Sequence, residues 1–106
     1  MSTAREYFEQ TLPVKLTPEM ANSVGAIYQF NIAGDGGGNW TVDLNKGEDW
    51  ISEGEADNAD CVISMKEKTF LKIIAKKTKP EMAFMMGQVK VAGNLALSLK
   101  LGKILN

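Results

Sequence analysis

Two short runs of alternating apolar and polar residues, joined by a glycine-rich turn, limit most strongly what this chain can fold into. Residues 26–32 and 40–44 place apolar side chains at every second position, as strands with one buried face do. Residues 34–39 between them contain four glycines, which is typical of a turn. The sequence therefore predicts a β-hairpin. Further strands are predicted at residues 50–51, 60–65 and 89–91.

Helix-start signals precede these strands. Thr3 and Glu6 have capping-box spacing, which predicts a short helix that ends by Pro13. Residues 17–18 pair a capping threonine with a proline at the first helical position. This pair predicts a second helix, which ends at Gly25.

More helices are predicted after the first four strands. Ser64 and Glu67 have capping-box spacing before a run with helical periodicity. Residues 78–81 repeat a start signal for a short helix that ends at Gly87, and Asn94 is expected to cap a last helix. The apolar residues of that last helix are Leu95, Leu97, Leu99, Leu101, Ile104 and Leu105. Strands in a block, with helices before and after, indicate an α+β fold in a single domain over residues 1–106.

The chain has no histidine and one cysteine, which excludes a histidine-based triad, a histidine-rich zinc site and an intramolecular disulfide. Cys61 lies on the apolar face of its predicted strand and is expected to be a buried thiol. The glycines of the turn lack the helix that a dinucleotide site needs after them. The acidic residues at 48–60 lack calcium-loop spacing. We therefore predict no catalytic site, no metal and no cofactor.

Charge is divided unevenly along the chain. Residues 1–60 carry three basic residues against eleven acidic ones, whereas residues 61–106 carry nine lysines against two glutamates. The two halves either complement each other in the folded domain, or the second half faces an anion. A transient contact with an anionic membrane is predicted through Lys68, Lys72, Lys76 and Lys77. Nucleic-acid binding is disfavoured, because these lysines lack interleaved aromatic residues beyond Phe70.

Methionines gather on one short predicted helix. Met82, Met85 and Met86 lie beside Phe84, so the helix is apolar on all sides, whereas a helix with one buried face needs only one apolar stripe. Methionine fills irregular space and adapts to apolar ligands of varying shape. The excess apolar surface indicates an internal cavity or an apolar ligand, with ordinary core packing as the alternative.

The same region carries a longer pattern. Residues 80–94 are Pro-Glu-Met-Ala-Phe-Met-Met-Gly followed by Gln-Val-Lys-Val-Ala-Gly-Asn, and residues 95–101 continue as a leucine-rich helix with a lysine. The hairpin over residues 28–44 and the strand-to-helix junction at residues 64–70 fit as well. Together these segments resemble the sterol carrier protein type 2 family over nearly the whole chain from about residue 17.

The resemblance implies a five-stranded, mostly antiparallel sheet with helices packed on one face, enclosing an apolar tunnel. It also implies non-catalytic binding, and transfer or presentation, of fatty acids, fatty acyl-CoA, sterols or phospholipids. The residues expected to line the tunnel are Phe30, Ile32, Trp40, Phe70, Ile74, Met82, Met85, Met86, Leu95 and Leu99. Gln88, Lys90 and Lys100 are expected to hold a carboxylate or phosphate headgroup, with ordinary surface lysines as the alternative.

Other functions fit this sequence less well than lipid binding does. The alternative is a non-lipid interaction or dimerisation module on the same fold. A homodimer that buries the leucine-rich last helix would support this alternative. An enzyme acting on acyl-thioesters is disfavoured by the lack of histidine. The chain begins without a signal peptide, contains no stretch of ~20 apolar residues, and does not end in the peroxisomal tripeptide common in eukaryotic members. These features predict a cytoplasmic location.

Overall fold

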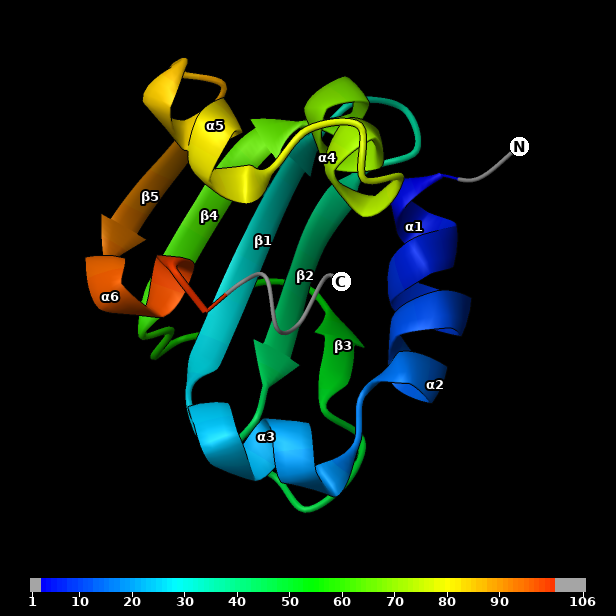
Figure 1. Cartoon of the computed structure of the whole chain (residues 1–106). Helices are drawn as coiled ribbons and strands as arrows, with labels where there is room; N and C mark the ends of the chain where they lie inside the picture. Colours follow the sequence, from blue (N-terminus) through cyan, green and yellow to red (C-terminus); the bar gives the residue numbers. More distant parts are fainter. Residues whose placement is uncertain (1–2, 101–106) are drawn as a thin grey trace.

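Five strands form one mixed sheet in the order β3-β2-β1-β4-β5 in the computed structural model, which describes residues 3–100. The strands are β1 (Ile27–Ala33), β2 (Gly38–Asp43), β3 (Ile51–Glu53), β4 (Cys61–Lys66) and β5 (Val89–Gly93). Only the β1–β4 pair is parallel among these strands, so the sheet is mostly antiparallel. The helices gather over one side of the sheet, which confirms the α+β prediction (Figure 1).

The helical segments precede and follow the strand block as predicted. They are α1 (Ala4–Glu6), the π-helical turn η1 (Tyr7–Thr11), α2 (Leu12–Lys15), α3 (Pro18–Val24), α4 (Glu67–Ile74), α5 (Pro80–Met85) and α6 (Leu95–Ser98). Leu101, Ile104 and Leu105, which the sequence placed on the last helix, lie outside the described residues.

The predicted hairpin is confirmed as the antiparallel pair of β1 and β2, in which Tyr28 faces Val42 and Phe30 faces Trp40. The turn depends on glycine at one close approach. A Cβ at Gly37 would lie 2.1 Å from the backbone oxygen of Ile32, a distance that no side chain tolerates. The glycine-rich turn therefore lets the two strands pair at this register.

The first helix was predicted to end by Pro13, and that prediction is wrong. Thr3 caps its start as expected, accepting a hydrogen bond from the Glu6 N–H. The chain then passes through η1, where the Leu12 N–H donates to the Tyr7 oxygen five residues back, and it stays helical to Lys15. A proline ring clashes with the carbonyl four residues before it in a regular helix. The wider turn gives the Pro13 ring room and lets the helix continue.

The predicted cap at Ser64 is also wrong. Ser64 lies inside β4, paired with Asn31 and Lys90, and α4 begins only at Glu67. Pairing on both sides of β4 extends the strand past the local capping signal. The Glu67 carboxylate instead accepts hydrogen bonds from distant backbone N–H groups.

The remaining helix signals are confirmed, except that Lys79 and not Thr78 is the N-cap of α5, with no side-chain capping bond. Thr17 accepts from the Met20 N–H, and Gly25 ends α3 in the left-handed conformation at φ 58°. The left-handed Gly87 follows α5 after Met86, and the Asn94 side chain accepts from the Ala96 N–H at the start of α6.

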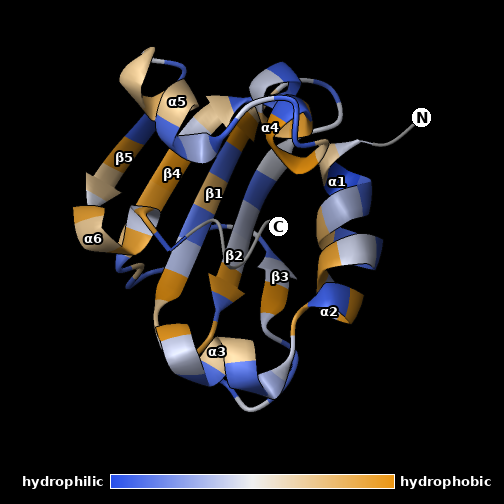
Figure 2. Ribbon diagram, in the orientation of Figure 1, coloured by the Kyte–Doolittle hydropathy of each residue, from blue (hydrophilic) through white to orange (hydrophobic). Residues whose placement is uncertain are grey.

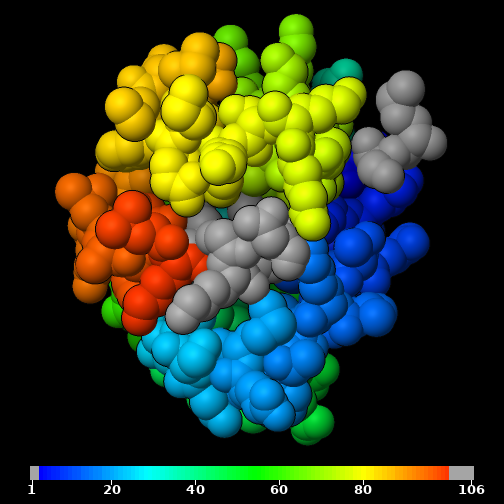
Figure 3. Space-filling model, viewed as in Figure 1, coloured from blue at the N-terminus to red at the C-terminus, as the bar shows by residue number. Residues whose placement is uncertain are grey.

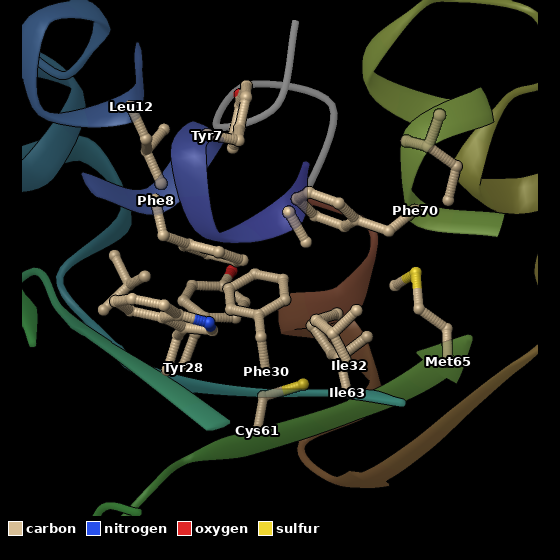
Figure 4. Packing of buried hydrophobic residues seen from close by; sticks show 14 of the residues in the cluster. Tyr7, Phe8, Leu12, Tyr28, Phe30, Ile32, Cys61, Ile63, Met65 and Phe70 are labelled. Atoms are coloured by element: carbon tan, nitrogen blue, oxygen red, sulfur yellow. The ribbon is translucent and has the colours of Figure 1, made fainter. Parts of the chain in front are cut away.

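A cluster of aromatic rings holds the N-terminal helices on the sheet. The Phe8 ring stacks on Trp40 at 5.2 Å and on Phe70 at 5.2 Å, and it lies 5.3 Å from Phe30. Figure 4 shows Phe8 and Phe70 reaching from the helices toward the strand side chains beneath them. Such ring pairs contribute about 0.5–1.5 kcal/mol each beyond the area they bury. The cluster is therefore a closed, packed part of the core.

Candidate functional site

An apolar groove of about 370 Å³ lies between α5, β5 and α6. Its lining consists of Pro80, Glu81, Phe84, Met85, Val89, Val91, Leu95, Ala96, Ser98 and Leu99. Apolar side chains dominate this set, and Glu81 is its one charged member. Ligand sites of this kind typically bind an apolar group and place only a few polar atoms around it.

The groove forms because the core buries few side chains of α5 and α6. Ala83 is the buried residue of α5, and α6 has no fully buried residue. The Tyr28 hydroxyl donates to the Leu97 backbone oxygen at 2.6 Å, which fixes α6 against the sheet. Leu97 is half-buried against the core, and the other large apolar side chains of the two helices and their C-caps are exposed, with Met85 79% exposed and Leu99 71% exposed. Figure 2 shows apolar colours along most of α5 and α6.

Strand β5 forms the floor of the groove. Val89 is buried beside Met65, and Val91 is half-buried beside Ile63. Both valines line the groove, and Lys90 between them points to the other side because strand side chains alternate. β5 has a neighbour on one side only, so the groove lies at the edge of the sheet.

The predicted tunnel residues are distributed over several parts of the molecule. Met85, Leu95 and Leu99 line the groove. Phe30, Trp40 and Phe70 are buried in the aromatic cluster, outside the groove lining. The remaining members lie elsewhere: Ile32 and Ile74 line two other hollows, and Met82 and Met86 are exposed on and just after α5.

The predicted headgroup residues do not gather at the groove. Gln88 and Lys90 line a larger hollow of about 660 Å³, here called the lysine hollow. Its charged lining residues are Lys66, Lys68, Lys72 and Lys90. Lys100 follows α6, where its N–H donates to the Leu97 oxygen. The structure therefore places the apolar lining and two of the headgroup residues on different sides of β5.

Sequence reasoning missed five apolar lining residues of the groove, namely Pro80, Phe84, Val89, Val91 and Ala96. The signal for the two valines was present, because alternation along residues 89–91 places both on the face of the sheet that the helices cover. Phe84 lies one turn of helix from Pro80, so the two share a side of α5. Their meeting with α6 depends on the packing of distant segments, which periodicity does not report.

Two buried side chains of the sheet have raised pKa values. Cys61 is fully buried, and burial raises the pKa of its thiol, with the nearby Asp60 adding to the rise. Burial also raises the pKa of Tyr28 above its ordinary value. Over residues 3–100, no group of three or more acidic or cysteine side chains is placed to hold a metal ion. None of the helices in that range is long and apolar enough to cross a membrane.

Known proteins are similar to this chain in sequence and in fold. The profile of the SCP-2 sterol transfer family matches residues 6–106. The hydroxysteroid dehydrogenase-like protein 2 of Bos taurus is 42% identical over 92 residues, which are 86% of this chain and 22% of that protein. The chain thus spans about a fifth of the length of this curated relative.

Two solved structures show the same fold. Sterol carrier protein 2 like 2 from Aedes aegypti superimposes with a TM-score of 0.77 at 21% identity, over 93% of this chain and 94% of that one. The solution structure of sterol carrier protein 2 from Aedes aegypti in complex with palmitate gives a TM-score of 0.69 at 18% identity, covering 99% and 96% of the two chains.

Proposed function

Because this chain belongs to the SCP-2 sterol transfer family, we propose that it binds a lipid by an acyl chain in the groove between α5, β5 and α6. The observation that carries the proposal is the groove itself, whose walls are almost wholly apolar and open to solvent at Met85 and Leu99. The palmitate held by the Aedes aegypti protein supports a fatty acid as the simplest ligand.

Binding of this kind needs little polar chemistry. Each methylene moved from water into an apolar site contributes about 0.8 kcal/mol, so a long chain binds without a strong headgroup contact. The acyl chain first contacts Met85 and Leu99, and then Val89 and Val91 on the floor of the groove. Fatty acyl-CoA, sterols and phospholipids share this requirement and are candidate ligands. The protein carries or presents the lipid and performs no reaction on it.

The predicted tunnel residues in the aromatic cluster can contact a lipid only if the core opens. Phe30, Trp40 and Phe70 are 2% exposed or less, and their rings pack with Phe8. We propose that they line an apolar tunnel, together with Ile32 and Ile74, in a lipid-bound form where the helices move away from the sheet. Met82 and Met86 would then complete the wall on the α5 side.

Gln88, Lys90 and Lys100 are proposed as headgroup contacts. Gln88 lies just before β5, beside the left-handed Gly87, and lines the lysine hollow together with Lys90. Exposed ion pairs contribute about 0.2–1 kcal/mol. Lys90→Met should therefore weaken palmitate binding by no more than about fivefold.

Native mass spectrometry of the purified protein tests the function. We expect a bound species whose mass is that of a fatty acid or phospholipid, and solvent extraction should release it for identification. After delipidation, the protein should bind added palmitate at one site per chain. A delipidated protein that binds neither palmitate nor a phospholipid would refute the proposed function. Fractionation of the cells that express the chain checks the predicted cytoplasmic location.

A non-lipid interaction or dimerisation module is the second candidate. The observation that favours it is the number of large apolar side chains that α5 and α6 expose, because such patches often mark contacts between proteins. Sedimentation over a wide range of concentrations distinguishes the two functions. A dimer that forms without lipid and is broken by Leu95→Asp would support the interaction module.

A further inference from the structure

Exposed apolar side chains are concentrated on one part of the molecule. Among residues 3–100, seven large apolar side chains are exposed, and six of them lie between Met82 and Leu99. The seventh, Val14 on α2, stands apart from the groove elements. Figure 3 shows the side chains of α5 and α6 at the surface of the same face. The groove lining includes four of the six, and Met82 and Met86 lie outside it.

A band of lysines borders this patch. Lys68 and Lys72 are exposed on α4, and Lys76, Lys77 and Lys79 are exposed in the segment that leads into α5. Lys68 and Lys72 share the lysine hollow with Gly87 and Gln88, so they lie close to the end of α5. Figure 1 shows α4 and α5 at the same end of the sheet.

Few acidic side chains on α4 and α5 offset these lysines, and Glu6 of α1 lines one hollow together with Lys77. Of the two glutamates on α4 and α5, Glu67 is turned inward, where its carboxylate accepts from the N–H groups of Ala4 and Gly36. Glu81 is therefore the remaining acidic group of these two helices. The patch combines outward apolar groups with a strongly basic border.

We propose that α5 docks into the surface of an anionic lipid bilayer, with Met82, Met85 and Met86 inserted among the headgroups and the lysines of α4 and the α4–α5 segment on the lipid phosphates. Apolar side chains and nearby lysines bind such surfaces together, through burial and through attraction to anionic lipid. A second copy of the chain fits less well, because a two-fold contact through this patch would bring two basic borders together.

Docking in this way also places the groove at the bilayer. Met85 belongs both to the inserted set and to the groove lining, so the opening of the groove faces the acyl chains. A lipid then passes between membrane and groove without crossing water. The passage of lipid into the groove rests on the proposed function, whereas docking to the bilayer is measured independently of lipid binding in the groove.

Vesicle flotation tests the docking with two matched pairs of variants. Vesicles of equimolar phosphatidylcholine and phosphatidylglycerol are compared with vesicles of phosphatidylcholine alone. Lys77→Glu is paired with Lys46→Glu, which makes the same charge change in the exposed β2–β3 turn. Met86→Asp is paired with Val14→Asp, which makes a similar change at another exposed apolar residue, 85% exposed against 65% for Met86.

We expect the wild-type chain to bind the anionic vesicles and not the neutral ones. Because each lysine near an anionic surface is worth about fivefold in partition, Lys77→Glu should weaken binding about fivefold or more. Met86→Asp should lower it to a similar extent, and the two controls should leave it unchanged. Lys77→Glu should bind palmitate in solution as the wild-type chain does.

The proposal is overturned if the wild-type chain does not bind anionic vesicles, or if each control weakens binding as much as its partner variant. It is also overturned by a lipid-free dimer that Met86→Asp dissociates while vesicle binding is absent, which would assign the patch to a second copy. Failure of docking with normal palmitate binding refutes this inference alone. Loss of palmitate binding in the wild-type chain refutes the proposed function instead.

Discussion

Glu67 shows how a single side chain joins segments that are far apart in the sequence. Its carboxylate accepts from the Ala4 N–H at 3.1 Å and from the Gly36 N–H at 3.2 Å. These bonds tie the first turn of α1 and the hairpin turn to the start of α4. The sequence suggested a capping role for this glutamate at the wrong partner, because the true partners are distant in the chain.

Replacing Glu67 should therefore destabilise the whole domain. Glu67→Ala leaves two partly buried N–H groups without their charged acceptor, and we expect a loss of about 1.5–3 kcal/mol in the free energy of unfolding. Glu67→Gln keeps one acceptor oxygen and should cost less. Urea unfolding measures both, with the exposed Glu81→Gln as a control within about 0.5 kcal/mol of wild type. Equal stability of Glu67→Ala and the control would contradict this role.

Two buried tyrosines make the fold sensitive to alkali. Burial raises the pKa of Tyr7 from 10.0 to about 12, and it raises that of Tyr28 as well. As pH rises past about 10, tyrosines of the unfolded chain lose their protons before those of the folded chain do. The two tyrosines should therefore make the free energy of unfolding fall progressively as the pH rises from about 10 toward 12. Urea unfolding at a series of alkaline pH values checks this, and a constant stability to about pH 11.5 would contradict it.

At the scale of elements, local signals succeeded where the structure is local. Alternation over residues 26–32 and 40–44 predicted the hairpin, because each strand carries its own pattern and the turn carries its own glycines. The signals at Pro13 and Ser64 failed for a shared reason. At Pro13, the wider turn η1 gives the proline ring room inside the helix. At Ser64, strand pairing on both sides of β4 keeps the serine in the strand. Both outcomes depend on structure outside the window in which the signal is read.

The attachment of the N-terminal helices to the sheet depends on Phe8. Its ring is fully buried between Trp40 and Phe70. Phe8→Ala should lower the free energy of unfolding by about 3–5 kcal/mol, from lost burial and from the cavity left behind. Val14→Ala, on the exposed part of the same helical segment, should change it by less than about 0.5 kcal/mol. Urea unfolding compares the two variants, and similar values would show that the ring does not hold the segment.

At the scale of the whole molecule, the structure places the predicted apolar residues and the predicted headgroup residues on different parts of the domain. The excess of apolar residues on residues 82–86 was visible in the sequence, and the structure places most of it on the outside, around an open groove. The predicted headgroup residues Gln88 and Lys90 were expected at the same opening. Alternation along β5 sends Lys90 to the other side, where it joins the lysines of the second half of the chain. Which faces meet is decided by tertiary packing, and one sequence pattern does not contain that information.

An acyl chain is proposed to occupy the groove between α5, β5 and α6. Isothermal titration of delipidated protein with palmitate measures this binding. Met85 lines the groove, so Met85→Asp places a carboxylate against the bound chain. We predict one palmitate per wild-type chain and binding at least about tenfold weaker in Met85→Asp. Val14→Asp should bind as the wild-type chain does. Equal palmitate affinity in wild type and Met85→Asp would contradict the account.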